Sequence, residues 1–165
     1  MNNLADLVDR LAKSEVLAQS VEEATRQAAV LPVLDALGWD WRDLDEVAPE
    51  YVVRGGRVDY CLRTAGRTQV LVEVKRTGTD LDAHQEQLLR YAFEEGAPLA
   101  VLTDGLVWWL YLPTETGSWE QRKFFTIDFR RQSSDVAALS LSRFLTKSAV
   151  VDGQAIEEAR AEHSG

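Results

Sequence analysis

The chain has 165 residues, of which 45% are hydrophobic and 27% charged, and its formal net charge is −9. This length and composition indicate a single soluble domain over residues 1–165, and the acidic balance argues against indiscriminate binding of polyanions. The lone Cys61 excludes an internal disulfide framework, and because neither a signal-peptide pattern nor an apolar run of about 20 residues is present, we expect a cytoplasmic protein without a membrane partner.

Two helices are expected before the first strand. Apolar residues at helical spacing predict one over residues 3–18, which either continues through Leu17 or breaks at Lys13-Ser14. Residues 20–23 are Ser-Val-Glu-Glu, the pattern of a capping box, and they predict a second helix that Pro32 kinks and Gly38 ends. Glu23 therefore has two alternative roles, one in this cap and one near a functional site.

Short apolar segments predict strands over residues 50–53, 58–62 and 70–75, and the polar residues 64–68 predict a β-hairpin between the last two. If this hairpin pairs symmetrically about Gly66, Asp59 lies opposite Glu73, and cross-strand partners share a face of the sheet. Lys75 is two residues beyond Glu73 and projects from the same face. Two carboxylates and one ammonium group are therefore expected to converge.

The second half of the chain continues the sheet. A helix capped by Asp80 or Asp82 and ending near residues 95–96 has Gln87 and Tyr91 on one face. The apolar run 99–103 predicts a strand buried on both faces, joined in parallel to the 69–75 strand by a β-α-β crossover. Asp104-Gly105 predicts a hairpin turn. Strands over residues 106–112 and 121–129 and helices over 135–145 and 154–162 complete an α/β domain with a central mixed β-sheet flanked by helices.

Asp59 and Glu73 supply the hard oxygen ligands that Mg²⁺ prefers, and Mg²⁺ usually takes only one or two carboxylates. A cation held there polarises a phosphoryl oxygen and generates hydroxide, while Lys75 orients the water or stabilises developing charge. The alternative is a solvated hairpin face with a cross-strand ion pair. Residues 1–50 carry 4 basic and 11 acidic side chains, a balance of −7, whereas residues 51–76 carry 6 basic and 2 acidic ones, a balance of +4. The hairpin region is therefore a basic island in an acidic chain.

These residues together resemble the PD-(D/E)xK nuclease superfamily, and more narrowly the N-terminal nuclease domain of type I restriction enzyme R subunits and their small stand-alone relatives. Four stretches carry the resemblance in order: Glu22-Glu23-Ala24-Thr25-Arg26 with Leu37-Gly38-Trp39-Asp40, then Arg57-Val58-Asp59-Tyr60, then Leu71-Val72-Glu73-Val74-Lys75, then Gln87-Leu88-Leu89-Arg90-Tyr91 with Leu102-Thr103-Asp104-Gly105. Val58 stands where the family's nominal proline precedes the Asp. The resemblance implies a restriction-endonuclease-like, three-layer α-β-α domain with its core over roughly residues 20–130, and with the helix 3–18 and the helices 135–162 as additions.

The resemblance implies a metal-dependent DNA endonuclease of restriction or phage defence, which hydrolyses phosphodiester bonds with Mg²⁺ or, as a substitute, Mn²⁺. Its site residues are carried over by motif. Asp59 and Glu73 match the metal-binding carboxylates, the Val74 carbonyl a third ligand, Lys75 the catalytic lysine, Gln87 and Tyr91 the Gln-x-x-x-Tyr motif, and Glu23 the acidic residue that closes the site. Arg57 and Arg76 of the basic island, with Tyr91, are the expected nucleic-acid-binding residues.

Three functions stay open: a nuclease acting alone or with a partner, a catalytically silent nuclease-fold module that binds nucleic acid or a defence-system protein, and a structural interaction domain. The retention of Asp59, Glu73, Lys75 and Gln87 favours the first, and the acidic balance favours the others as autonomous activities. The expected partners are DNA and either a second copy of the chain or a restriction-system subunit. Because the sequence contains no Gly-x-x-x-x-Gly-Lys-[Ser/Thr] loop, ATP is not expected, nor is a complete ATP-driven restriction subunit.

Overall fold

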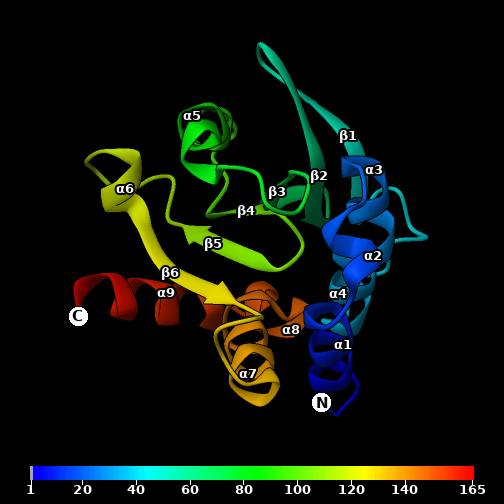
Figure 1. Ribbon diagram of the computed structural model, residues 1–165. Helices are drawn as coiled ribbons and strands as arrows, with labels where there is room; N and C mark the ends of the chain where they lie inside the picture. Colours follow the sequence, from blue (N-terminus) through cyan, green and yellow to red (C-terminus); the bar gives the residue numbers. More distant parts are fainter. Residues whose placement is uncertain (1) are drawn as a thin grey trace.

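The computed structural model describes residues 2–165 and contains a six-stranded mixed sheet flanked by helices (Figure 1). The strands lie side by side in chain order, and all neighbours are antiparallel except β3 and β4, which are parallel. The strands are β1 (Val47–Val53), β2 (Gly56–Thr64), β3 (Arg67–Val74), β4 (Leu99–Thr103), β5 (Val107–Tyr111) and β6 (Lys123–Asp128). The parallel β3–β4 pair confirms the predicted crossover.

Helices precede, interrupt and follow the sheet. Before it lie α1 (Asn2–Ala12), α2 (Glu15–Ala18), α3 (Glu22–Thr25), the π-helical η1 (Arg26–Val30) and α4 (Leu31–Ala36). The 3-10 segment η2 (Leu81–His84) and α5 (Gln85–Glu95) connect β3 to β4, and α6 (Trp119–Arg122) precedes β6. After the sheet come α7 (Ser134–Leu145), α8 (Lys147–Val151) and α9 (Gln154–Ser164). None of the helices described over residues 2–165 is long and apolar enough to cross a membrane.

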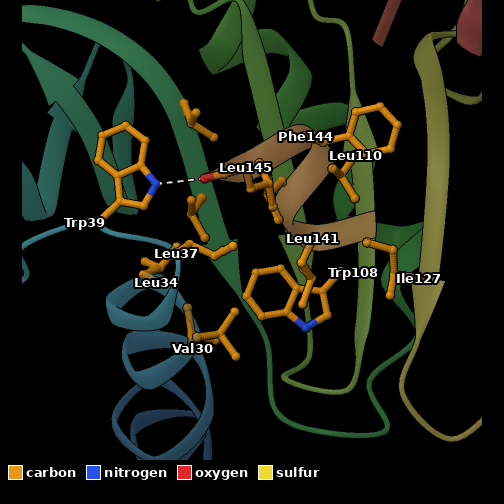
Figure 2. Packing of buried hydrophobic residues seen from close by; sticks show 14 of the residues in the cluster. Val30, Leu34, Leu37, Trp39, Trp108, Leu110, Ile127, Leu141, Phe144 and Leu145 are labelled. Carbon is orange, nitrogen blue, oxygen red and sulfur yellow. Dashed lines mark hydrogen bonds between the residues drawn. The ribbon is translucent and has the colours of Figure 1, made fainter. Parts of the chain in front are cut away.

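The sheet separates two hydrophobic clusters, which makes the arrangement compatible with three layers, α-β-α. The smaller cluster lies under α5, and the larger one joins the other face to α1, α4, α7 and α9. In the larger cluster the indole of Trp39 is buried and its Nε1 donates to the Leu145 carbonyl at 2.9 Å, which ties the end of α4 to α7 (Figure 2). In β4, Leu99 and Val101 belong to one cluster and Ala100 and Leu102 to the other. This confirms the predicted strand buried on both faces.

The N-terminal helices differ from the prediction in two places. The helix expected over residues 3–18 is broken, because Ser14 caps α2 by accepting the Leu17 N–H at 3.0 Å. The break at Lys13-Ser14, one of the two alternatives, is therefore the observed one. The capping box at residues 20–23 is wrong, since the N-cap residue is Val21 without a side-chain cap and the Ser20 hydroxyl donates to the Val16 carbonyl.

Pro32 does not end the second helix but follows a π-helical turn. A proline inside a helix lacks the N–H donor, and its ring crowds the carbonyl four residues earlier. The wider η1 turn, Arg26–Val30, lies directly before α4, where Pro32 occupies the first turn. Single π-turns of this kind interrupt α-helices and change which face the preceding residues present. An irregular π-helical turn therefore lies directly before Pro32, where a kink was predicted, and the helix then ends at Leu37-Gly38 as predicted, with φ +96° at Gly38.

The β2–β3 hairpin has the register that brings the candidate residues together. Its turn is tighter than predicted, with only Ala65 and Gly66 between the strands, at φ of +50° and +74°. A bulge between Leu62 and Arg63 then shifts the register, and Tyr60 pairs with Val72. The next residues in this register are Asp59 and Glu73. Beyond the bulge the register is therefore the predicted one, symmetric about Gly66, whereas the pairs between the bulge and the turn are centred between Ala65 and Gly66.

Candidate functional site

Asp59 and Glu73 meet where β2 and β3 stop pairing. The Glu73 side chain accepts the backbone N–H of Asp59 at 3.1 Å, and Asp59 Oδ2 accepts the backbone N–H of Val74 at 2.7 Å. Each carboxylate thus accepts a backbone N–H of the other strand just beyond the last paired residues. Only 8% of the Asp59 side chain and 17% of the Glu73 side chain are exposed. The two strands therefore hold a desolvated pair of carboxylates in fixed positions.

Lys75 completes the predicted group. Its Nζ lies 3.4 Å from Glu73 Oε2, and its backbone N–H donates to the Thr103 carbonyl at 2.8 Å. That second bond keeps the chain attached to β4 for one residue beyond the end of β3. The predicted convergence of Asp59, Glu73 and Lys75 is confirmed as geometry, while their chemical roles stay predictions.

Arg26 is the member of the group that the sequence did not reveal. Its Nη1 donates to Asp59 Oδ1 at 2.7 Å and to Glu22 Oε2 at 3.3 Å, and its Nη2 pairs with Glu23 Oε1. From the sequence, Glu22, Glu23 and Arg26 have only the three- and four-residue spacing of an ordinary surface ion pair on a helix. The contact with Asp59, which is 33 residues away, appears only in the fold.

Close packing on the β4–β5 turn positions the helix that carries Arg26. Thr25 and Ala29, on either side of Arg26 in the chain, are fully buried. A Cβ added to Gly105 would lie 3.0 Å from the Thr25 methyl carbon and 3.3 Å from Ala29 Cβ, and Gly105 has a φ of +92°. The turn therefore has room only for glycine, and this contact fixes η1 relative to the sheet.

Asp104 fixes the chain beyond Lys75. Its Oδ1 accepts the N–H groups of Leu106 and Val107, and its Oδ2 accepts the N–H of Gly78 at 3.0 Å. The Thr77 hydroxyl also donates to the Asp104 carbonyl at 2.7 Å. One buried aspartate therefore ties the β4–β5 turn to the loop that follows β3, close to the candidate site.

The charges in the group shift the pKa of two members in the same direction. Burial, together with the negative charge of Asp59, raises the pKa of Glu73 to about 7, although Lys75 opposes the shift. Burial alone would lower the pKa of Arg26, but the bond to Glu23 and the charge of Asp59 outweigh it, and the pKa is raised. Arg26 therefore stays charged, whereas burial and the charge of Asp59 disfavour the ionised form of Glu73.

The other predicted residues lie around this group in different ways. Glu23 is exposed and reaches Asp59 only through Arg26. Gln87 is exposed on α5, and no side-chain hydrogen bond found within residues 2–165 joins it to the carboxylates. Tyr91 is buried, and its hydroxyl donates to the Gly55 carbonyl at 3.3 Å, which gives it a structural role at the β1–β2 turn. Arg57 and Arg76 are exposed, as surface contacts with a nucleic acid would require.

The inward-facing glutamine of α5 is Gln85, which sequence reasoning missed. It is buried and accepts a 2.5 Å hydrogen bond from the Tyr111 hydroxyl, and its amide donates to Asp82 and Glu120. Its two acidic partners lie on η2 and α6. Gln85 therefore holds α5 against β5 and α6, and this position gives it a structural role.

The carboxylate oxygens of the group are the type of ligand that a hard divalent cation prefers. Two carboxylates lie together, but within residues 2–165 no set of three or more His, Cys, Asp or Glu side chains is placed to hold a metal ion. All four carboxylate oxygens of Asp59 and Glu73 also face donors of this chain: Arg26, the Val74 N–H, the Asp59 N–H and Lys75. A metal would therefore take its remaining ligands from water or substrate, as Mg²⁺ usually does.

A groove adjoins this group on the side of the N-terminal helices. It has a volume of about 440 Å³, and it is lined mainly by apolar side chains, among them Leu31, Trp41 and Leu44. Glu23, which pairs with Arg26, and Tyr60, which follows Asp59 on β2, also line it. The groove therefore reaches the group at Glu23, and Asp59 and Glu73 do not line it. Comparisons of the chain with protein-family models, curated proteins and solved structures found no match.

Proposed function

We propose that this protein is a metal-dependent DNA endonuclease of restriction or phage defence, with a restriction-endonuclease-like core. One observation carries the proposal, namely that Asp59, Glu73 and Lys75 converge where two strands part, with Lys75 Nζ 3.4 Å from Glu73. A magnesium ion held by the two carboxylates would polarise the scissile phosphate and lower the pKa of a bound water.

In this proposal the chain's own groups prepare the reaction. Asp59 Oδ2 accepts the Val74 N–H, which fixes the orientation of this carboxylate at the site. Lys75, held by Glu73 and by its own backbone bond to β4, provides positive charge where negative charge develops on the phosphate. Arg57 and Arg76 are exposed and would bind the DNA backbone on either side.

The direct test is a cleavage assay on linear, circular and single-stranded DNA with Mg²⁺ or Mn²⁺. We expect Asp59→Asn, Glu73→Gln and Lys75→Met each to lower the cleavage rate at least about 100-fold, because each removes a group from the reacting centre. Glu94→Gln, an exposed change on α5, is the matched control. Circular dichroism must show that the variants are folded. Cleavage that continues in a chelator, or that survives Asp59→Asn, would contradict the proposal.

A second candidate is a nuclease-fold module that no longer cuts and binds nucleic acid or a defence-system partner. The observation that favours it is that Asp59 and Glu73 already have partners within the chain at every carboxylate oxygen. The exposed Gln87, which lies outside the hydrogen bonds of the group, favours it as well. DNA binding without cleavage under all metal conditions would select this candidate.

A further inference from the structure

Arg26 occupies the position next to Asp59 where a cation is needed. Its guanidinium Nη1 is 2.7 Å from Asp59 Oδ1, the oxygen that the Val74 N–H leaves open. Both side chains are shielded from water, with 19% of Arg26 and 8% of Asp59 exposed. A carboxylate so poorly hydrated is strongly destabilised when it loses its positive partner. Arg26 can therefore leave Asp59 only if another cation takes its place.

Two other partners for the Arg26 guanidinium lie in the preceding turn of the same helical segment. Glu22 and Glu23 precede it by four and three residues, and both already contact the guanidinium. Their side chains are 41% and 59% exposed, so they are partly hydrated whether or not Arg26 contacts them. A small rotation of the Arg26 side chain would thus give up the buried partner Asp59 and keep the two exposed ones, so that the guanidinium stays paired.

The charges in the group match a divalent ion. When ionised, Glu22, Glu23, Asp59 and Glu73 contribute four negative charges, and Arg26 and Lys75 contribute two positive ones. The remaining two negative charges equal the charge of one Mg²⁺ or Mn²⁺. A divalent ion would therefore neutralise the group without expelling either basic residue from it.

We propose that Arg26 is a built-in competitor of the metal, which holds Asp59 until a divalent cation displaces the guanidinium toward Glu22 and Glu23. This inference rests on the metal-dependent function proposed above. It makes Arg26 a positioning residue that keeps the carboxylate ordered in the metal-free protein and weakens metal binding. Removing Arg26 should then strengthen metal binding, the opposite of what loss of a simple structural residue would do.

The test measures Mn²⁺ binding to the full chain by the electron paramagnetic resonance signal of the free ion, without any DNA. We expect Arg26→Met to bind Mn²⁺ about tenfold more tightly than the wild type, because the ion no longer competes with a guanidinium. Arg26→Lys keeps the positive charge and should stay close to the wild type. Arg10→Met, on α1, is the matched control, and Asp59→Asn should remove the binding altogether.

Two further measurements separate competition from loss of structure. Metal-free Arg26→Met should melt at a lower temperature than the wild type, and saturating Mn²⁺ should close this gap, since the ion then partners Asp59. Glu22→Gln removes one alternative partner of the released guanidinium and should weaken Mn²⁺ binding about two- to threefold. Because Glu22 is partly exposed, this variant tests the inference even if Arg26→Met does not fold.

The outcomes distinguish the inference from the function on which it rests. Asp59-dependent Mn²⁺ binding that is equal or weaker in Arg26→Met overturns the role of Arg26 and leaves the proposed function standing. If no variant shows Asp59-dependent Mn²⁺ binding, the proposed function and the inference both fail. Tighter binding in Arg26→Met together with weaker binding in Glu22→Gln supports the exchange of the two cations.

Discussion

Glu73 is a carboxylate whose charge opposes folding. Burial and the neighbouring Asp59 raise its pKa to about 7, against an ordinary value of 4.5. A group whose pKa is raised in the folded protein contributes stability below its unfolded pKa and loses that contribution as the pH rises through the folded value. The wild type should therefore lose stability at this residue between about pH 4.5 and pH 7.

Glu73→Gln removes this pH dependence. Relative to the wild type, we expect the free energy of unfolding of the variant to improve by on the order of 2 kcal/mol between pH 4.5 and pH 8. Urea denaturation of both proteins at the two pH values measures the difference. Glu94→Gln, on the exposed side of α5, should follow the wild type at both values. A difference between Glu73→Gln and the wild type that does not change with pH would show that Glu73 ionises as freely as a surface glutamate.

Gly105 lies in the β4–β5 turn and packs against the helix that carries Arg26. We expect Gly105→Ala to destabilise the protein by about 2–3 kcal/mol, from the positive φ and the contact with Thr25 together. Gly153→Ala is the matched control, since Gly153 also has a positive φ, +85°, but no atom within 4 Å of an added Cβ. It should cost only about 1 kcal/mol.

The steric part of this cost is open to a direct check by thermal and urea denaturation. Adding Thr25→Ser to Gly105→Ala removes the methyl carbon that lies 3.0 Å from the new Cβ, so part of the lost stability should return. Equal costs for Gly105→Ala and Gly153→Ala would mean that the turn and the helix are not tightly packed at this point.

At the scale of elements, the β2–β3 hairpin carries a correctable defect. Both residues of its two-residue turn have positive φ, which is the type I′ geometry that Asn-Gly favours. The first position is Ala65, and an alanine is strained at φ +50°. The sequence between β2 and β3 is therefore less favourable than the turn requires.

Ala65→Asn should relieve this strain and stabilise the protein by about 0.5–1 kcal/mol, because asparagine adopts the left-handed region readily. In a chain of this size we expect the melting temperature to rise by roughly 1–4 °C, measured by circular dichroism or calorimetry. Ala65→Val should lower it, since a β-branched residue is disfavoured at positive φ. A melting temperature that responds alike to both changes would argue against a type I′ turn.

The same elements show what could be inferred from the sequence. The hairpin and the placement of Asp59 opposite Glu73 were predicted correctly, although this register depends on a bulge between Leu62 and Arg63 that the sequence did not reveal. The crossover to β4 followed from an apolar run that could only be buried on both faces. Such local patterns determine the strands, and the three-layer arrangement follows from them.

Other features depend on contacts between distant residues and were missed. The place of Arg26 depends on the π-helical turn and on the packing of Thr25 against Gly105. On α5, the preceding 3-10 segment η2 changes the start of the helix, and Gln85 is buried where the spacing had drawn attention to Gln87. The five-residue α8 is too short for a helical period to be recognised.

At the scale of the whole molecule, charge is unevenly distributed. The net charge is −9, yet residues 51–76 have a balance of +4. Part of this region belongs to the β1–β2 hairpin, whose turn extends past the neighbouring strands (Figure 1). If the protein binds DNA, most of the surface repels the phosphates and only a few basic residues attract them. Binding should then be weak and sensitive to salt.

Arg57 and Arg76 are expected to contact DNA phosphates without reading the base sequence. Arg57→Gln and Arg76→Gln should each weaken binding to double-stranded DNA about equally for all sequences, and each should reduce the slope of log K against log salt concentration by about 0.9. Fluorescence anisotropy with a labelled duplex between about 20 and 200 mM salt measures this slope. Arg10→Gln, outside residues 51–76, should leave the slope unchanged. If all three variants keep the wild-type slope, DNA does not contact the basic island, and the affinity must come from another surface or a partner subunit.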